Sequence, residues 1–181
     1  MKRVVITGMG WITPLGNNLD TVWKRMCNSE SAIAPIDRFD ASSFPTKFAG
    51  QVRDFDWKNY VKDTSVHNDP AMNSQFALGA ARQAWDQSGL GHYKELNLDR
   101  AGIYLGAGEG VLDFSAHSMI DTHAWDVEDG KIDAVAWAKF ATKQLNEWGE
   151  VEQEPNMPLW HVAKEYGFQG PAFNCLTACA A

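Results

Sequence analysis

Three short apolar runs, each followed by a turn of small residues, constrain the fold of this chain more than any other feature. They cover residues 3–7, 101–105 and 172–177. Their continuous apolar character is typical of strands buried on both faces. Helical patterns lie between them, and the clearest spans residues 73–89. Short apolar strands that alternate with helices predict an α/β sheet with right-handed crossovers.

The helical pattern over residues 73–89 carries its apolar residues on one face and ends at a glycine. Several alanines on that face predict close packing against a neighbour. A second pattern, over residues 158–166, has a proline in its first turn and a glycine as its stop. Residues 28–66 are mostly irregular, and their many phenylalanines predict a loop that is packed down rather than disordered.

The length of 181 residues suits one ordinary domain, and the formal charge of −7 argues against nucleic-acid and anionic-lipid partners. No apolar stretch approaches membrane-spanning length, and the first residues enter a strand pattern without a signal peptide. The three cysteines have no zinc-site spacing and do not predict a disulfide framework. A reducing cytoplasmic location is the simplest interpretation.

Two glycine-rich segments resemble nucleotide-binding loops only superficially. After Gly8 and Gly10 the third glycine is replaced by Thr13, and the glycines at residues 106–110 lack the dinucleotide pattern. Both segments are therefore interpreted as tight turns at strand ends. The acidic residues between 113 and 129 do not fit a calcium loop, so a solvated face is favoured over a metal site.

Cys179 is the main candidate for chemistry. It follows the run 172–177 at a point where small residues predict a sharp strand-to-helix turn, and helix N-termini favour a reactive thiolate. The alternative is a buried structural cysteine. Cys175 and Cys27 are interpreted as core packing. The five histidines, none of which fits a catalytic motif, are expected to be structural or solvent-facing: His67, His92, His117, His123 and His161.

Six motifs in order resemble the N-terminal half of a β-ketoacyl-acyl-carrier-protein synthase, a condensing enzyme of fatty-acid and polyketide synthesis. These are residues 3–16 (RVVITGMGWITPLG), 36–50, 74–90, 99–110, 166–171 (YGFQGP) and Thr177-Ala178-Cys179. Two stretches depart from the family: residues 67–73, where it usually carries a basic segment, and residues 111–155.

The resemblance implies a thiolase-like α/β fold of which residues 1–181 form the N-terminal synthase domain only, with residues 111–155 as a cap or insertion. It implies that Cys179 is the acylation site, and that the catalytic histidines and lysine come from the other half. It implies no metal or redox cofactor. The implied partners are an acyl carrier protein with phosphopantetheine-linked acyl chains and a second copy in a homodimer.

The resemblance implies decarboxylative condensation of an acyl thioester with a malonyl-type thioester. Because the chain stops two residues after Cys179, we expect these 181 residues alone to be inactive. Two alternatives stay open. The chain is a non-catalytic structural subunit that pairs with another half-synthase, or it belongs to a degradative thiolase, which the motif at residues 3–16 disfavours.

Overall fold

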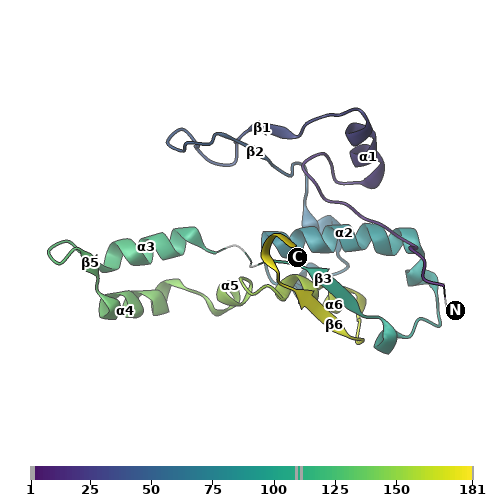
Figure 1. Cartoon of the computed structure of the whole chain (residues 1–181). Helices are drawn as coiled ribbons and strands as arrows, with labels where there is room; N and C mark the ends of the chain where they lie inside the picture. Colours follow the sequence, from purple (N-terminus) through teal and green to yellow (C-terminus); the bar gives the residue numbers. More distant parts are fainter. Residues whose placement is uncertain (1–2, 109, 111, 181) are drawn as a thin grey trace.

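The centre of the molecule is a parallel strand pair packed beside two helices (Figure 1). The computed structural model describes residues 3–108, 110 and 112–180. Strand β3 (Ile103–Gly106) pairs in parallel with β6 (Ala172–Cys175). The helices are α2 (Met72–Ser88) and α6 (Met157–Tyr166), which pack against each other. This arrangement confirms the predicted α/β class.

Two further parts extend from this centre in Figure 1. One contains α1 (Leu19–Cys27) and the antiparallel pair β1 (Ile33–Pro35) and β2 (Phe48–Gly50). The other is a long helical hairpin, made of α3 (Phe114–Ala124), β4 (Trp125–Asp126), β5 (Lys131–Ile132) and α4 (Ala134–Gln144). The short helix α5 (Glu147–Val151) leads from the hairpin back to α6. No helix in the described part of the chain is long and apolar enough to cross a membrane.

Short 3-10 helices occupy several connections. They are Trp57–Tyr60, Thr64–Val66, Leu90–His92, Leu98–Arg100 and Ala178–Ala180.

Helices α2 and α6 form where the sequence predicts them. Each ends at a glycine in the left-handed region, Gly89 with φ 69° and Gly167 with φ 70°, a conformation that costs glycine little. Leu78 at the centre of α2 is completely buried. The rings of Trp85 on α2 and Tyr166 on α6 lie 4.6 Å apart, which extends the contact between the two helices.

The segment before α1 crosses α2 at very short range, as the small residues of that helix predict. A Cβ on Gly8 would lie 2.0 Å from the Ala84 carbonyl oxygen, and one on Gly10 would lie 2.0 Å from that of Ala80. Gln83 on α2 fixes the crossing: its Oε1 accepts from the Trp11 N–H at 3.2 Å, and its Nε2 donates to the Trp11 carbonyl at 3.1 Å.

The predicted strand at residues 3–7 is wrong. These residues belong to no strand, and Val4 and Ile6 are 97% and 84% exposed. A β-prone run becomes a strand only when a neighbour completes its hydrogen bonds. Among the described residues β3 pairs with β6 alone. The chain just beyond the run is instead held by α2, where the Met9 N–H donates to Gln87 Oε1 at 2.7 Å.

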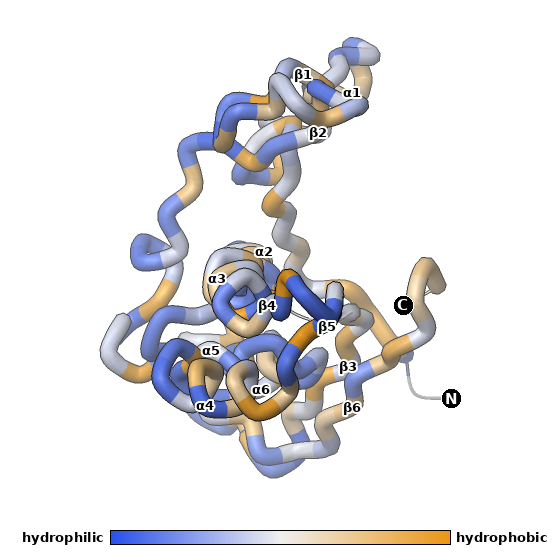
Figure 2. Tube along the Cα trace, turned by 90° about the vertical axis from the view of Figure 1, so that its left-hand side faces the viewer, coloured by the Kyte–Doolittle hydropathy of each residue, from blue (hydrophilic) through white to orange (hydrophobic). Residues whose placement is uncertain are grey.

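The expectation that residues 28–66 are packed down holds only in part. Phe55 packs against Phe76 of α2, with ring centroids 5.5 Å apart. By contrast Phe39, Phe44 and Phe48 are each more than half exposed. They belong to the part that carries β1 and β2, which stands apart from the two central helices in Figure 2.

Residues 112–155 form the helical hairpin and its return through α5. The two long helices are joined by Trp137 Nε1, which donates to Asp121 Oδ1 at 2.7 Å, and by His123 stacked on Phe140 with centroids 4.0 Å apart. The interpretation of residues 111–155 as a cap or insertion stays a prediction, and residue 111 lies outside the described residues.

Candidate active site

The parallel register of β3 and β6 brings two predicted motifs to one edge. Gly106, the last residue of β3, is paired with Cys175, the last residue of β6. The Ala107 N–H donates to the Cys175 carbonyl at 3.4 Å, just past the end of the pair. The glycine-rich loop and the thiol turn therefore leave the sheet at the same carboxyl edge, where open α/β sheets generally bind ligands.

A sharp turn follows β6, as the sequence predicts. Ala178 has φ 51°, a left-handed conformation that is unfavourable for a residue with a Cβ. The turn closes with the Ala180 N–H, which donates to the Thr177 carbonyl at 3.1 Å. Cys179 lies inside this turn as an exposed free thiol. Its exposure does not fit the alternative of a buried structural cysteine.

The other two thiols differ from Cys179 in their surroundings. Cys175 is half-buried, with its Sγ 3.6 Å from Thr177 Oγ1. Cys27 is exposed on α1, so the prediction that it belongs to the core is wrong. Helix α1 buries only Val22, and Cys27 is its last residue, one position before the asparagine that ends the helix.

Two of the five histidines are completely buried, a feature that the sequence interpretation missed. His67 and His161 contact each other through their Nδ1 atoms at 3.0 Å, and each also contacts a buried glutamate. One signal was available, because His161 and Glu165 are four residues apart and thus share one face of α6. The pairing with His67 is 94 residues distant and could not be read from local spacing.

The acidic residues of the hairpin mainly cap turns and helices. Asp113 accepts from the Ala116 N–H, and Asp126 accepts from the N–H groups of Glu128 and Asp129. Within residues 3–108, 110 and 112–180 no group of three or more His, Cys, Asp or Glu side chains could hold a metal ion. The expectation that no cofactor is needed stays a prediction.

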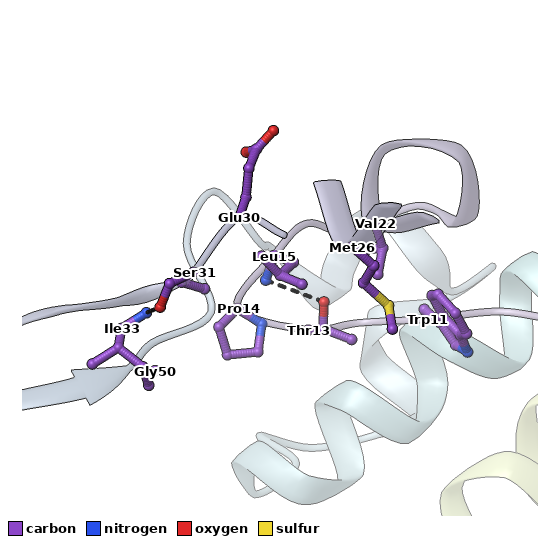
Figure 3. Close-up of a pocket in the computed structure, with 11 residues that line it drawn as sticks. Trp11, Thr13, Pro14, Leu15, Val22, Met26, Glu30, Ser31, Ile33 and Gly50 are labelled. Carbon is purple, nitrogen blue, oxygen red and sulfur yellow. Dashed lines mark hydrogen bonds between the residues drawn. The ribbon is translucent and has the colours of Figure 1, made fainter. Parts of the chain in front are cut away.

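A cavity of about 480 Å³ lies between α1 and the β1–β2 pair (Figure 3). Its walls are largely apolar, with Trp11, Val22 and Met26 on one side and Ile33 on the other. Glu30 stands at its rim, paired with Arg25 at 2.8 Å. None of the residues of the thiol turn lines this cavity, so it is a feature separate from the Cys179 turn.

Comparison with known proteins shows which family the chain belongs to. The family model for the β-ketoacyl synthase N-terminal domain matches residues 1–181. The chain is 46% identical over 178 residues to 3-oxoacyl-[acyl-carrier-protein] synthase 2 of Coxiella burnetii, covering 98% of this chain and 39% of that protein. It therefore spans about two fifths of the length of that relative.

Solved structures agree on the fold. A β-ketoacyl synthase from Burkholderia phymatum superposes with a TM-score of 0.67 at 19% identity, over 95% of this chain and 38% of that one. A type II polyketide ketosynthase in complex with its acyl-carrier protein gives 0.61 at 18% identity, over 96% and 37%.

The fold thus defines the structural class, an α/β protein with the architecture of these solved ketosynthases. Within that class, the chain belongs to the β-ketoacyl synthase family and represents its N-terminal domain. The curated relatives are named as 3-oxoacyl-[acyl-carrier-protein] synthases and not as non-catalytic subunits.

Proposed function

We propose that the complete protein is a 3-oxoacyl-acyl-carrier-protein synthase and that Cys179 is its acylation site. One observation carries the proposal: an exposed free thiol lies in a strained turn at the carboxyl edge of β3 and β6, in a chain of the β-ketoacyl synthase family. Thiolate suits this chemistry because it is both a strong nucleophile and a good leaving group.

The reaction has two covalent steps. The Cys179 thiolate attacks the carbonyl of an acyl thioester, so that a new S–acyl bond forms and the carrier thiol leaves with a proton. A malonyl-type thioester then loses CO₂, and the resulting carbanion attacks the acyl-Cys179 carbonyl. The new C–C bond gives a 3-oxoacyl thioester and returns the cysteine as thiolate. No electrons are exchanged with a redox partner.

The proposed substrates are acyl groups carried on the phosphopantetheine arm of an acyl carrier protein. Two observations support this choice: the relatives are named for that carrier, and one structural neighbour is a ketosynthase in complex with its acyl-carrier protein. We also propose a cytoplasmic homodimer in which residues 1–181 are the N-terminal synthase domain and residues 111–155 act as a cap.

Site-directed replacement of the thiol in the complete gene product tests the function. Cys179→Ala is expected to abolish formation of 3-oxoacyl product from acyl- and malonyl-carrier protein, because no nucleophile then accepts the acyl group. Cys27→Ala, which removes an exposed thiol on α1, is the matched control and is expected to keep full activity. Retention of condensing activity by Cys179→Ala would refute the assignment.

A further inference from the structure

Four buried titratable side chains form a continuous hydrogen-bonded series between α6 and the loop before α2. His67 Nδ1 lies 3.0 Å from His161 Nδ1. The outer Nε2 atoms contact carboxylates, His67 with Glu165 Oε2 at 3.0 Å and His161 with Glu152 Oε1 at 2.8 Å. All four side chains are at most 4% exposed. We call these four residues the His–Glu cluster.

The contacts fix the number of protons in the cluster. The second oxygen of each carboxylate accepts a backbone N–H, from Ala71 at 2.9 Å for Glu152 and from Lys62 at 3.1 Å for Glu165. Each of the three contacts inside the cluster needs one proton between its two heavy atoms. Two neutral imidazoles supply only two protons. Completing all three contacts therefore needs a third proton, shared within the cluster.

Groups on the neighbouring elements do not supply the third proton. The Lys62 ammonium lies 6.0 Å from the centre of the Tyr166 ring, and burial raises the pKa of Tyr166, which stays neutral. Arg82 on α2 is paired with Asp86 at 2.7 Å. Asp63 is exposed, and hydrogen bonds from the next turn, with a smaller contribution from the charge of His67, lower its pKa.

The two histidines are not equivalent. Burial lowers the pKa of His161, although the adjacent Glu152 carboxylate opposes that effect. The third proton lies between the two Nδ1 atoms, which are 3.0 Å apart. His161 in turn donates its Nε2 proton to Glu152.

The cluster is linked to the thiol edge through the segment that follows α5. The Gln153 carbonyl accepts from the Gly110 N–H at 2.7 Å, and the Pro155 carbonyl accepts from Asn174 Nδ2 in β6 at 2.9 Å. Gly110 approaches so closely that a Cβ there would lie 2.3 Å from the Glu152 carbonyl oxygen. Residues 152–155 thus hold both the glycine-rich loop and the strand that leads to the thiol turn.

We propose that the His–Glu cluster is a positioning unit for the Cys179 turn. With three protons in place, Glu152 is anchored at both oxygens, and residues 152–155 keep the glycine-rich loop and β6 in register. The catalytic consequence rests on the proposed function, whereas the proton count and the anchoring do not.

The proton count predicts a distinctive dependence of stability on pH. Unfolded histidines titrate near about pH 6.5. Well above that pH the unfolded cluster binds two protons and the folded one three, so its contribution to stability falls as pH rises. Well below it the unfolded cluster binds four and the folded one three, so the contribution falls as pH decreases. The contribution therefore has its maximum near about pH 6.5.

A double variant isolates this contribution. We compare the free energy of unfolding of the wild type with that of His67→Asn/His161→Asn, from about pH 5 to about pH 8. The difference in unfolding free energy between wild type and double variant, plotted against pH, is expected to peak near the ordinary histidine pKa. The same plot for the exposed control His92→Asn is expected to have no such peak. A difference that changes in one direction only would mean two or four bound protons and would overturn the count.

A second measurement needs no variant. In protein labelled with ¹⁵N-histidine, nuclear magnetic resonance is expected to show protons on both Nε2 atoms and one strongly deshielded proton shared by the two Nδ1 atoms. Because a purely structural packing of neutral rings lacks that shared proton, its absence from the folded protein would overturn the proposal even if the double variant fails to fold.

The positioning role is tested in the complete gene product with Glu152→Gln. In this variant the side-chain amide nitrogen of residue 152 faces a donor, either the Ala71 N–H or the His161 Nε2, and that contact is lost. Hydrogen exchange of the backbone amides at Gly110 and in β6 is therefore expected to accelerate about tenfold. Condensation turnover is expected to fall with little change in KM. Glu154→Gln, an exposed neighbour, is the matched control.

The outcomes separate the two claims. Unchanged exchange in Glu152→Gln, or faster exchange with unchanged turnover, would overturn the positioning role. A wild-type protein without condensing activity would overturn the proposed function. The pH dependence of stability and the exchange measurement would still test the proton count and the anchoring role of the His–Glu cluster.

Discussion

Gly10 lies on the segment that crosses α2 at very short range. Because a Cβ there would meet the Ala80 carbonyl at 2.0 Å, Gly10→Ala must push the crossing segment away from the helix. We expect the free energy of unfolding to fall by about 2 kcal/mol, the usual cost of overpacking a tight contact. Urea denaturation of the purified protein measures the change.

The matched control is Gly108→Ala, since, its chain neighbours aside, no atom of the residues that the structure describes lies within 4 Å of a Cβ built at Gly108. Its effect is expected to stay within about 0.5 kcal/mol, as for most substitutions in open space. Equal losses in the two variants would show that the crossing at Gly10 is not as close as described.

At the scale of the elements, helix α2 contributes Leu78 to the core. Its side chain is completely buried between α2 and its neighbours, so Leu78→Ala leaves a cavity that the packed helices can only partly fill. A loss of about 3 kcal/mol in unfolding free energy is expected. Leu90→Ala, at a residue 36% exposed, is expected to cost less than half as much. Comparable losses would contradict a core centred on the α2–α6 contact.

Elements whose signals are local could be predicted from the sequence. Helices α2 and α6 start and stop within two residues of the predicted ranges, because apolar spacing and the left-handed glycines at 89 and 167 act within one helix. The strand predicted at residues 3–7 does not form, because a strand depends on a partner elsewhere in the chain. Its Val-Val-Ile composition indicates β propensity but says nothing about whether a partner is present.

The same distinction applies to the candidate site. The turn at Cys179 was predictable since a β-prone run, a Thr-Ala-Cys sequence and small residues lie next to one another. The His–Glu cluster was not, because it joins His67 to His161 and Glu152 across three separate segments. Only the fold brings these side chains together, and only their burial shows that their protons must be counted.

At the scale of the whole molecule, three parts meet at residues 152–155. This segment follows α5, at the end of the return from the helical hairpin (Figure 1). It contacts the loop before α2 through Glu152 and holds β6 through Pro155. The hairpin, the central helices and the thiol edge therefore share one junction.

The central claim is that Cys179 carries the acyl group, and mass spectrometry of the intermediate tests it most directly. The complete gene product is incubated with an acyl-carrier protein in the absence of the malonyl extender, quenched in acid and digested. The account predicts that one acyl group is added per chain, on the peptide containing Cys179, and that this adduct is lost on addition of malonyl-carrier protein. An acyl group on Cys175 or Cys27 instead, or no adduct in a protein that still condenses, would contradict it.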